Sequence, residues 1–183
     1  MEYKVTRTWA EINLDNIAHN VREIRRIVGK RTEIMAVVKA DAYGHGVLET
    51  VSTLLENGTT RLAVSMLDEA IQLRKTGIDV PILVLSHTHP KRADELIKYQ
   101  ITQTVYSHDM AKALSDEAMR QGVKAKIHIK IDTGMGRVGF PPGYSAVKAV
   151  MEIQKLPGIT IEGIFSHFAT ADEEDGSYTM HQM

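Results

Sequence analysis

Cysteine is absent from the 183 residues, which excludes disulfide bonds, thiolate nucleophiles and cysteine-ligated zinc. An excess of one charge is also missing, because 22 basic and 23 acidic residues leave a formal net charge of −1. A protein that binds nucleic acid or an anionic membrane through its charge needs a basic patch, which this composition does not provide. We therefore expect neither a nucleic acid nor a membrane as a partner.

Long hydrophobic runs are missing as well. No run approaches the roughly 20 apolar residues that span a bilayer, and the first residues lack the apolar segment of a secretion signal. These absences predict a cytoplasmic protein. With 43% hydrophobic residues and no Pro/Gly-rich linker or longer repeat, the chain is expected to fold as one domain.

Short apolar runs alternate with segments of helical periodicity along the whole chain. The six strand candidates cover residues 34–38, 62–66, 80–85, 101–106, 126–131 and 159–165. Helical spacing is clearest over residues 14–28 and 47–55, with Asp15 as the expected N-cap of the first helix. The glycines expected after helix ends are Gly29, Gly58, Gly77 and Gly122. This alternation predicts an α/β fold with a parallel sheet covered by helices.

Polar side chains stand at or just after the end of every predicted strand. They are Lys39, Ser65, Ser86, Tyr106, Lys130 with Asp132, and His167. The carboxyl ends of parallel strands carry the functional site in open sheets and barrels alike, but side chains from six strand ends converge best in a closed sheet. We therefore predict a (β/α)8 TIM-type barrel. Because a complete barrel takes about 250 residues, the barrel is expected to be truncated after about six strands.

Lys39 stands at the end of a strongly apolar strand, where low polarity should disfavour its ammonium form and lower its pKa. Such a lysine can attack an aldehyde. Gly44 and Gly46 follow and lead into the helix expected near Val47, whose free N–H groups would suit a phosphate. The segment therefore favours a phosphorylated aldehyde as the ligand, although a lone strand-end lysine more often lies at the rim of a sheet with its charge in water.

Residues 36–46, Ala-Val-Val-Lys-Ala-Asp-Ala-Tyr-Gly-His-Gly, resemble the cofactor-lysine signature of the alanine racemases, which are pyridoxal-phosphate enzymes of fold type III. Residues 13–20, 131–140 and 166–172 resemble the same family, so the resemblance covers essentially the whole chain. It implies an enzyme that interconverts L-alanine and D-alanine with pyridoxal 5'-phosphate and supplies D-alanine for peptidoglycan. Residues 1–183 would be the N-terminal part of the barrel domain, without the last barrel strands and the second, β domain.

The resemblance also implies roles for three residues that precede the fourth strand. Lys39 would hold the cofactor covalently and then act as the base on one face of the substrate α-carbon. Tyr43 would bind the cofactor phosphate, and Leu85 would pack against the cofactor ring. The plain alternatives are a half-buried tyrosine at the rim of the sheet and an ordinary core leucine.

Three further roles follow from the resemblance. Arg137 would approach the cofactor phenolic oxygen and the substrate, and Lys130 matches a lysine that is carbamylated in several family members, where it orients that arginine. His167 would lie beside the cofactor ring and help to hold an arginine from the later barrel strands. A surface ion pair is the plain alternative for Lys130 and Arg137.

Two groups of the family machinery lie outside the chain: the arginine that contacts the pyridine nitrogen, and the opposite-face tyrosine that the partner subunit of the homodimer contributes. Racemisation removes a proton on one face and delivers one on the other. The 183 residues alone are therefore predicted not to be a competent racemase, although the full-length protein is expected to be a homodimer that acts on alanine.

Three other interpretations compete. Gly134, Gly136 and Gly139 satisfy the dinucleotide pattern G-x-G-x-x-G, but Phe140-Pro141-Pro142 follows, where a helix should begin. The residues His87, His89, Lys130 and His167 resemble the ligands of metal-dependent barrel hydrolases, although Pro90 and two basic residues after His89 favour a solvent-facing loop. Small barrel proteins that carry pyridoxal phosphate without catalysis are the non-enzymatic alternative, and residues 41–46 favour the racemase over them.

Overall fold

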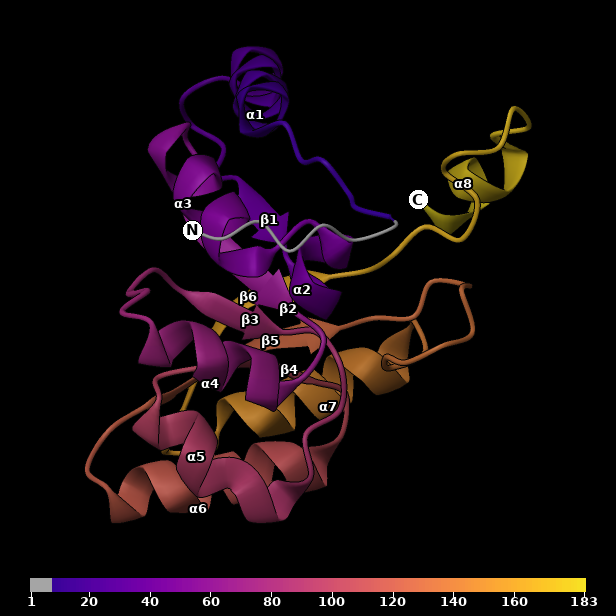
Figure 1. Cartoon of the computed structure of the whole chain (residues 1–183). Helices are drawn as coiled ribbons and strands as arrows, with labels where there is room; N and C mark the ends of the chain where they lie inside the picture. Colours follow the sequence, from indigo (N-terminus) through magenta and orange to yellow (C-terminus); the bar gives the residue numbers. More distant parts are fainter. Residues whose placement is uncertain (1–7) are drawn as a thin grey trace. The chain divides into compact units, whose positions relative to one another are not determined.

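The computed structural model describes residues 8–183, and the chain divides into two compact units, Met1–Leu62 and Ala63–Met183. Six strands follow one another across one sheet in the order β1-β2-β3-β4-β5-β6 (Figure 1). They are β1 Met35–Val37, β2 Arg61–Val64, β3 Ile82–Val84, β4 Thr102–Val105, β5 Ala125–Lys130 and β6 Ile159–Phe165. Each overlaps one predicted strand, so the predicted alternation is confirmed.

The helices fill the intervals between the strands. They are α1 Leu14–Val28, α2 Lys39–Gly44, α3 Val47–Glu56, α4 Leu67–Lys75, the 3-10 helix η1 Pro90–Arg92, α5 Ala93–Lys98, α6 His108–Arg120, α7 Tyr144–Gln154 and α8 Ser177–Gln182. Among the described residues, even the longest of these helices is too short and too polar to cross a membrane. The predicted glycines all follow helix ends with positive φ: Gly29, Gly58, Gly77 and Gly122.

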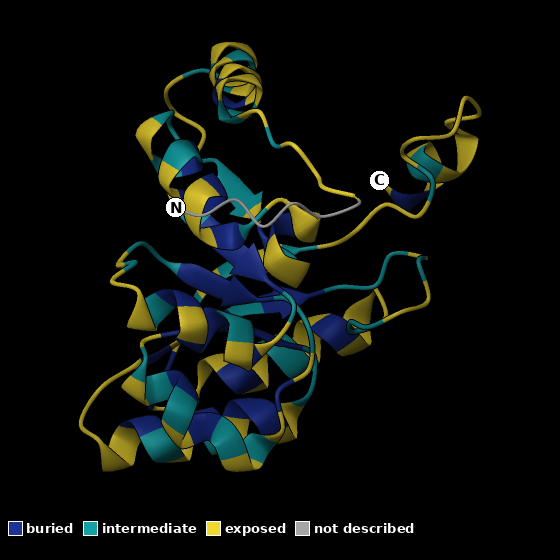
Figure 2. Cartoon of the chain, viewed as in Figure 1, coloured by how far each residue is buried: buried dark blue, intermediate teal, exposed yellow. Residues whose placement is uncertain are grey.

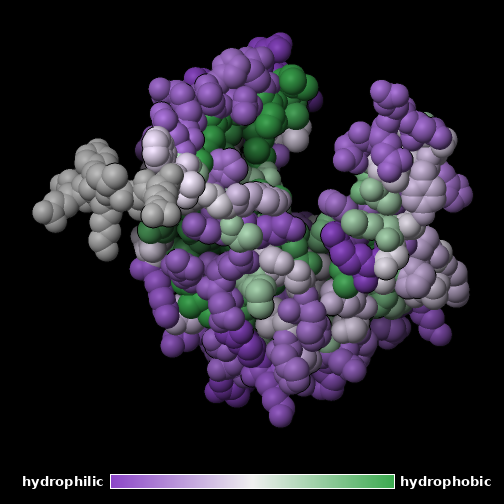
Figure 3. All heavy atoms as spheres, turned by 45° about the vertical axis from the view of Figure 1, so that its right-hand side comes forward, coloured by the Kyte–Doolittle hydropathy of each residue, from purple (hydrophilic) through white to green (hydrophobic). Residues whose placement is uncertain are grey.

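The first unit packs α1 against α3. The predicted N-cap of α1 is wrong by two residues: Asn13 caps the helix, because its Oδ1 accepts the N–H of Asn16 at 3.0 Å, and Asp15 lies inside the first turn. Ala18 and Val21 are the buried residues of α1, whereas Ile24, Ile27 and Val28 remain exposed. Figure 3 shows hydrophobic side chains gathered over this helix.

The second unit is built on parallel pairs from β3 to β6. Helix α4 contacts β3, α6 contacts β4, β5 and β6, and α7 contacts β6, so that these helices cover one face of the sheet (Figure 1). Strands β3, β4 and β5 and the inner helix faces form the buried core, whereas only Ile159 of β6 is buried and the outer helix faces are exposed (Figure 2). The largest fully buried side chains of the second unit include Leu73, Leu96, Leu114, Ile127 and Ile153. This layer aligns the strand ends on which the predicted site depends.

Candidate active site

The segment after β1 has an unusual backbone. Ala40, Asp41, Ala42 and Tyr43 all have positive φ, between 51° and 56°, and ψ between 34° and 53°. The N–H of Ala42 donates to the carbonyl of Val38 at 3.0 Å, so the four residues form one left-handed helical turn. Left-handed backbone costs about 1–2 kcal/mol for each L-residue that is not glycine. Strain of this size is typical of functional segments, where the surrounding structure holds it in place.

Hydrogen bonds from both sides hold this turn. The Asp41 Oδ1 accepts the N–H of Val47 at 2.8 Å, which caps α3. The Asp41 carbonyl accepts the N–H of Gly46 at 3.1 Å, and the carbonyl of Ala42 accepts the N–H of His45 at the same distance. Helix α3 begins at Val47 as predicted, and Asp41 occupies the first of the N–H groups that were expected to suit a phosphate.

The turn presents two of the predicted site residues. Lys39 follows the end of β1 by two residues and is partly buried. Its Nζ lies 5.8 Å from the centre of the Tyr43 ring, and Tyr43 is 59% exposed. An amine and a phenol hydroxyl are thereby brought together within the first unit. The first unit therefore offers the Lys39 amine as a nucleophile and the Tyr43 hydroxyl as a hydrogen-bond donor to a ligand.

Polar side chains in the second unit also gather at strand ends, as predicted. The hydroxyl oxygens of Ser65 and Ser86 lie 3.0 Å apart, beyond the ends of β2 and β3. Leu85, next to Ser86, is partly buried and donates its N–H to the carbonyl of Val64 at 2.8 Å. Burial raises the pKa of Tyr106, which follows β4. The carboxyl ends of β2, β3 and β4 therefore line up.

Lys130 ends β5 and is a buried lysine, with only 3% of its surface exposed. Its Nζ donates to the carbonyl of Ile131 at 2.8 Å and lies 5.5 Å from the centre of the Phe165 ring. Burial lowers the pKa of Lys130; the nearby charge of Asp132 opposes this shift and that of Arg137 adds to it. Lys130 is therefore a buried lysine rather than a member of a surface ion pair, and Arg137 contributes a like charge near it.

Asp132 shapes the loop that carries Arg137. Its Oδ1 accepts the N–H groups of Gly134 at 3.1 Å and Gly136 at 3.0 Å, and its Oδ2 accepts the N–H of Arg137 at 3.0 Å. The bond from Gly136, followed by those from Gly134 and Arg137, holds the pKa of Asp132 below its usual range. The sequence placed Asp132 at the strand end but did not reveal this role.

Gly139 closes the same loop. Its φ is +140°, and a Cβ at this position would lie 2.4 Å from the backbone nitrogen of Asp132. The neighbouring Phe140 donates its N–H to the carbonyl of Lys130 at 2.9 Å and accepts the N–H of Asp132 at 3.0 Å. The glycines of this loop therefore serve a tight closure. No helix follows Gly139 until α7 begins at Tyr144, which does not fit a dinucleotide-binding turn.

His167 follows β6 by two residues and is exposed. Its carbonyl accepts a hydrogen bond from the side-chain amide of Gln182, at 3.3 Å. Gln182 is buried, and nothing in the sequence pointed to it, because glutamine is common on helices and this contact joins residues 15 positions apart.

The proposed metal ligands are engaged in other ways. The Nδ1 of His89 accepts the N–H of Lys91 at 3.1 Å and caps η1, whereas the ring of His87 lies 6.4 Å from that of Tyr106. Within residues 8–183, no group of three or more histidine, aspartate or glutamate side chains is placed to hold a metal ion. The structure therefore gives the metal-dependent hydrolase no support.

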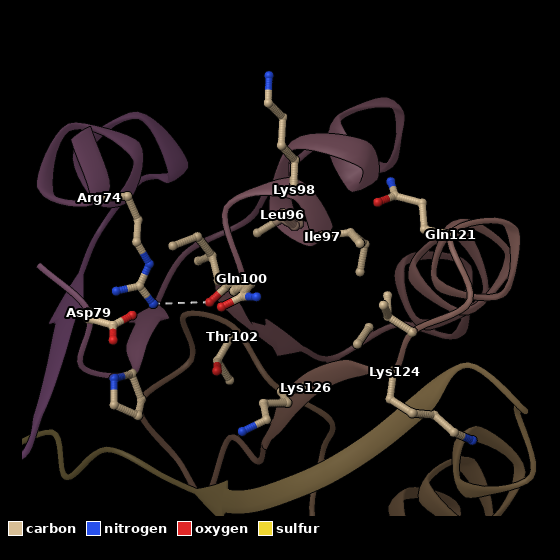
Figure 4. Close-up of a pocket in the computed structure, with 14 residues that line it drawn as sticks. Arg74, Asp79, Leu96, Ile97, Lys98, Gln100, Thr102, Gln121, Lys124 and Lys126 are labelled. Atoms are coloured by element: carbon tan, nitrogen blue, oxygen red, sulfur yellow. Dashed lines mark hydrogen bonds between the residues drawn. The ribbon is translucent and has the colours of Figure 1, made fainter. Parts of the chain in front are cut away.

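A cavity of about 530 Å³ lies at the amino ends of β4 and β5, away from the strand ends discussed above (Figure 4). Its basic residues are engaged within the protein. Arg74 donates to the carbonyls of Ile78, Val80, Tyr99 and Gln100. Lys126 pairs with Glu162 at 2.8 Å. The cavity therefore fits a structural junction between strands and helices better than a site of chemistry.

The sequence of the chain matches the family model of the N-terminal domain of alanine racemase over residues 12–183. The chain belongs to the alanine racemase family. An alanine racemase of Clostridium perfringens strain SM101 is 54% identical over 182 residues, which is 100% of this chain and 47% of the relative. An alanine racemase of Clostridium tetani is 54% identical over 95% of this chain and 45% of its own length. The chain thus spans about half the length of the relatives it matches.

Solved structures agree with this assignment. An alanine racemase of Clostridium difficile 630 in complex with cycloserine matches with a TM-score of 0.94 and 44% identity, over 99% of this chain and 50% of the other. A histidine racemase from Leuconostoc mesenteroides matches with a TM-score of 0.86 and 33% identity, over 92% of this chain and 45% of its own. These matches confirm the predicted fold as part of the alanine racemase barrel domain.

Each unit by itself offers groups that suit pyridoxal phosphate. The first unit offers the Lys39 amine for an aldehyde and the Tyr43 hydroxyl for a phosphate oxygen. The second unit offers the apolar side chain of Leu85, the guanidinium of Arg137 and the imidazole of His167, all at or beyond strand ends. An amine, donors for anionic oxygens and an apolar surface are the groups that an aromatic phosphorylated aldehyde requires.

Proposed function

We propose that this chain is the cofactor-bearing part of an alanine racemase and that Lys39 holds pyridoxal phosphate. The observation that carries the proposal is the strained left-handed turn immediately after Lys39, in a chain that belongs to the alanine racemase family. A turn that costs several kcal/mol is retained where it presents a side chain for function. A barrel that only carries the cofactor remains the alternative, which the family match disfavours.

The roles of the chain's own residues follow from their placement. When bound, pyridoxal phosphate supplies an electron sink for the negative charge that deprotonation leaves on the α-carbon. Lys39 Nζ would remove the α-proton on one face of the substrate, and its strand-end position fixes the direction of approach. Tyr43 would hold a phosphate oxygen, and Leu85 would exclude water from one side of the ring. Arg137 and His167 would orient the ring edge and the substrate carboxylate.

Lys130 fits the role of a carbamylated lysine. Its neutral amine would add carbon dioxide, forming an N–C bond and releasing one proton, and the product would carry a negative charge. Burial favours the neutral amine because it lowers the pKa of Lys130. A carbamate at this position would face the charge of Arg137, whose electrostatic effect already reaches Lys130, and would orient that guanidinium.

The relatives are about twice as long as this chain. We propose that the remaining barrel strands and a second domain complete the site, and that the whole protein acts as a cytoplasmic homodimer that makes D-alanine for peptidoglycan. The chain of 183 residues alone would then lack the acid–base group for the opposite face. Incubation with pyridoxal phosphate and L-alanine should give no steady formation of D-alanine; sustained turnover would contradict this expectation.

Alanine is the substrate that the family match favours. A histidine racemase shares this half of the fold at 33% identity, so this half of the fold is compatible with racemases named for a small or a large substrate. We therefore propose that substrate size is set mainly by the half of the protein outside this chain. Grafting that half from a histidine racemase onto this chain should transfer the preference for histidine; retained preference for alanine would contradict the proposal.

The test of the cofactor assignment is chemical trapping. The chain is mixed with pyridoxal phosphate, reduced with borohydride, and digested for mapping by mass spectrometry. We expect one modified lysine, Lys39, and no such adduct in Lys39→Ala, whereas Lys148→Ala, which removes an exposed lysine of α7, should leave the adduct unchanged. Adducts scattered over surface lysines in a chain that circular dichroism shows to be folded would overturn the assignment.

A further inference from the structure

Gln182, in α8, joins two loops that are far apart in the sequence. Its Oε1 accepts the N–H of Ala169 at 2.8 Å. Its Nε2 donates to the carbonyl of His167 at 3.3 Å and to the Oγ1 of Thr133 at 3.4 Å. The side chain is therefore bonded at both ends, to the loop after β6 and to the loop after β5, while the residue is only 6% exposed.

Neighbouring contacts strengthen the same junction. The Tyr178 hydroxyl, one turn earlier in α8, donates to the carbonyl of Gly134 at 2.6 Å. Gly134 has no side chain that could interfere: a Cβ there would lie 2.7 Å from that hydroxyl oxygen. The hydroxyl oxygens of Thr133 and Ser166 lie 2.7 Å apart and link the two loops directly. Helix α8 thus contacts both loops through the side chains of Tyr178 and Gln182.

Each of the two loops carries one residue of the proposed site. Arg137 lies three residues after Gly134, in the loop that Asp132 organises. His167 is itself bonded to Gln182 through its carbonyl. A buried amide that is bonded at both ends resists displacement, because leaving buried polar partners without hydrogen bonds costs free energy. Helix α8 therefore ties the two loops together, in addition to the direct contact between Thr133 and Ser166.

We propose that Gln182, assisted by Tyr178, is a positioning residue that fixes the loop of Arg137 relative to the loop of His167, so that both side chains meet the cofactor in one orientation. The effect on the cofactor rests on the proposed function. The contacts of Gln182 and Tyr178 with the two loops, which we call the clamp, lie within the second unit and do not depend on it. Gln182 touches neither reacting atoms nor cofactor in this role. It acts through Thr133, His167 and Ala169.

Three variants test the clamp at increasing severity. Tyr178→Phe removes the bond to Gly134 and keeps the ring. Gln182→Glu keeps an acceptor for Ala169 but removes the donor to Thr133 and His167. Gln182→Leu removes both polar ends at nearly the same volume. Gln154→Leu, at the exposed end of α7, is the matched control.

The first readout is the motion of the loops in the chain without cofactor. Nitrogen-15 relaxation should show both loops, residues 133–136 and 167–169, becoming more mobile in Gln182→Glu and Gln182→Leu. Hydrogen exchange at the Ala169 N–H should accelerate in Gln182→Leu and stay slow in Gln182→Glu, which retains the acceptor. Loops as rigid as those of wild type in both variants would overturn the clamp.

The second readout is the affinity for pyridoxal phosphate and the orientation of the bound cofactor. Gln182→Glu, which loses two hydrogen bonds, and Gln182→Leu, which loses three, should each bind pyridoxal phosphate about tenfold more weakly, and Tyr178→Phe, which loses one, about threefold more weakly. The visible circular dichroism of the bound cofactor, which reports its orientation, should also change, while trapping still modifies Lys39. Unchanged affinity and dichroism despite loosened loops would show that the clamp positions nothing. If wild type gave no Lys39 adduct, the proposed function would fail, and the relaxation result alone would decide the clamp.

Discussion

The two segments that follow β1 and β5 reach unusual backbone shapes by opposite means. After β1, four residues with side chains, from Ala40 to Tyr43, take left-handed conformations and bear the strain. After β5, glycines occupy the positive-φ positions at 134, 136, 139 and 143, and the Asp132 carboxylate organises the loop. Strain is thus kept next to the proposed cofactor lysine, whereas the arginine loop is shaped with little strain. We infer that the first segment presents a side chain rigidly and the second only has to close tightly.

The largest effect is expected where the second segment closes on itself. Gly139→Ala would place a Cβ 2.4 Å from the Asp132 nitrogen, and backbone rather than a flexible side chain would have to move. We expect a loss of about 3 kcal/mol in the free energy of unfolding, measured by urea denaturation. The matched control is Gly136→Ala, which has φ of +72° and nothing within 4 Å, and should cost about 1 kcal/mol. Equal losses would mean that crowding at Gly139 is not what shapes the loop.

The two segments also differ in the burial of their lysines. Lys130 is buried, whereas Lys39 is partly exposed. Its pKa is lowered in the folded state, so the unfolded chain holds more protons between the two pKa values and stability rises with pH there. Lys130→Met should therefore raise the free energy of unfolding by about 1 kcal/mol at neutral pH. The gain should shrink as pH rises toward the ordinary lysine pKa.

Urea denaturation at several pH values checks this expectation. Lys112→Met, which removes an exposed lysine of α6, is the control and should show no such pH dependence. A Lys130→Met variant less stable than wild type at neutral pH would contradict the argument, since it would mean that the bond to the Ile131 carbonyl outweighs the cost of burial.

The strain in the first segment can be tested with a smaller change. Ala40→Gly removes the Cβ that makes φ of 51° costly, and the gain exceeds the extra entropy of the unfolded chain. We expect stabilisation by about 0.5–1 kcal/mol. Ala113→Gly, in the right-handed helix α6, should instead destabilise by a similar amount. If both substitutions lowered the free energy of unfolding, the left-handed turn would not be strained.

The elements that sequence reasoning found are those with periodic patterns. Each of the six strands is a short apolar run, and β6 matches residues 159–165 completely. The N-cap of α1 was misplaced because Asn13 and Asp15 are both good caps, and periodicity alone locates a helix start only to within a residue or two. The residues at strand ends were found because a parallel sheet aligns those ends.

The parts that sequence reasoning missed depend on contacts between distant residues or on strain. Nothing in Ala-Asp-Ala-Tyr predicts a left-handed turn, because none of these residues favours that conformation strongly. Gln182 reaches Thr133 across 49 positions, which no local pattern records. Asp132 was readable in principle, since an aspartate followed by Thr-Gly-Met-Gly is typical of a turn in which the carboxylate accepts backbone N–H groups.

The smallest effect on stability, and the most local one, is expected at Asp132. Asp132→Asn keeps an oxygen for backbone N–H groups but removes the charge that strengthens these bonds. Because the folded pKa of Asp132 is lowered, its stabilising effect is complete above the ordinary carboxyl pKa and is lost as pH falls through the folded value. Hydrogen exchange at the N–H groups of Gly136 and Arg137 should therefore accelerate in Asp132→Asn at neutral pH, with little change in the α6 helix. In wild type, protection of these groups relative to their intrinsic exchange should weaken only at acid pH, and in the variant it should not change with pH. If the Gly136 and Arg137 groups stayed equally protected in the variant, the glycines rather than the carboxylate would be what shapes the arginine loop.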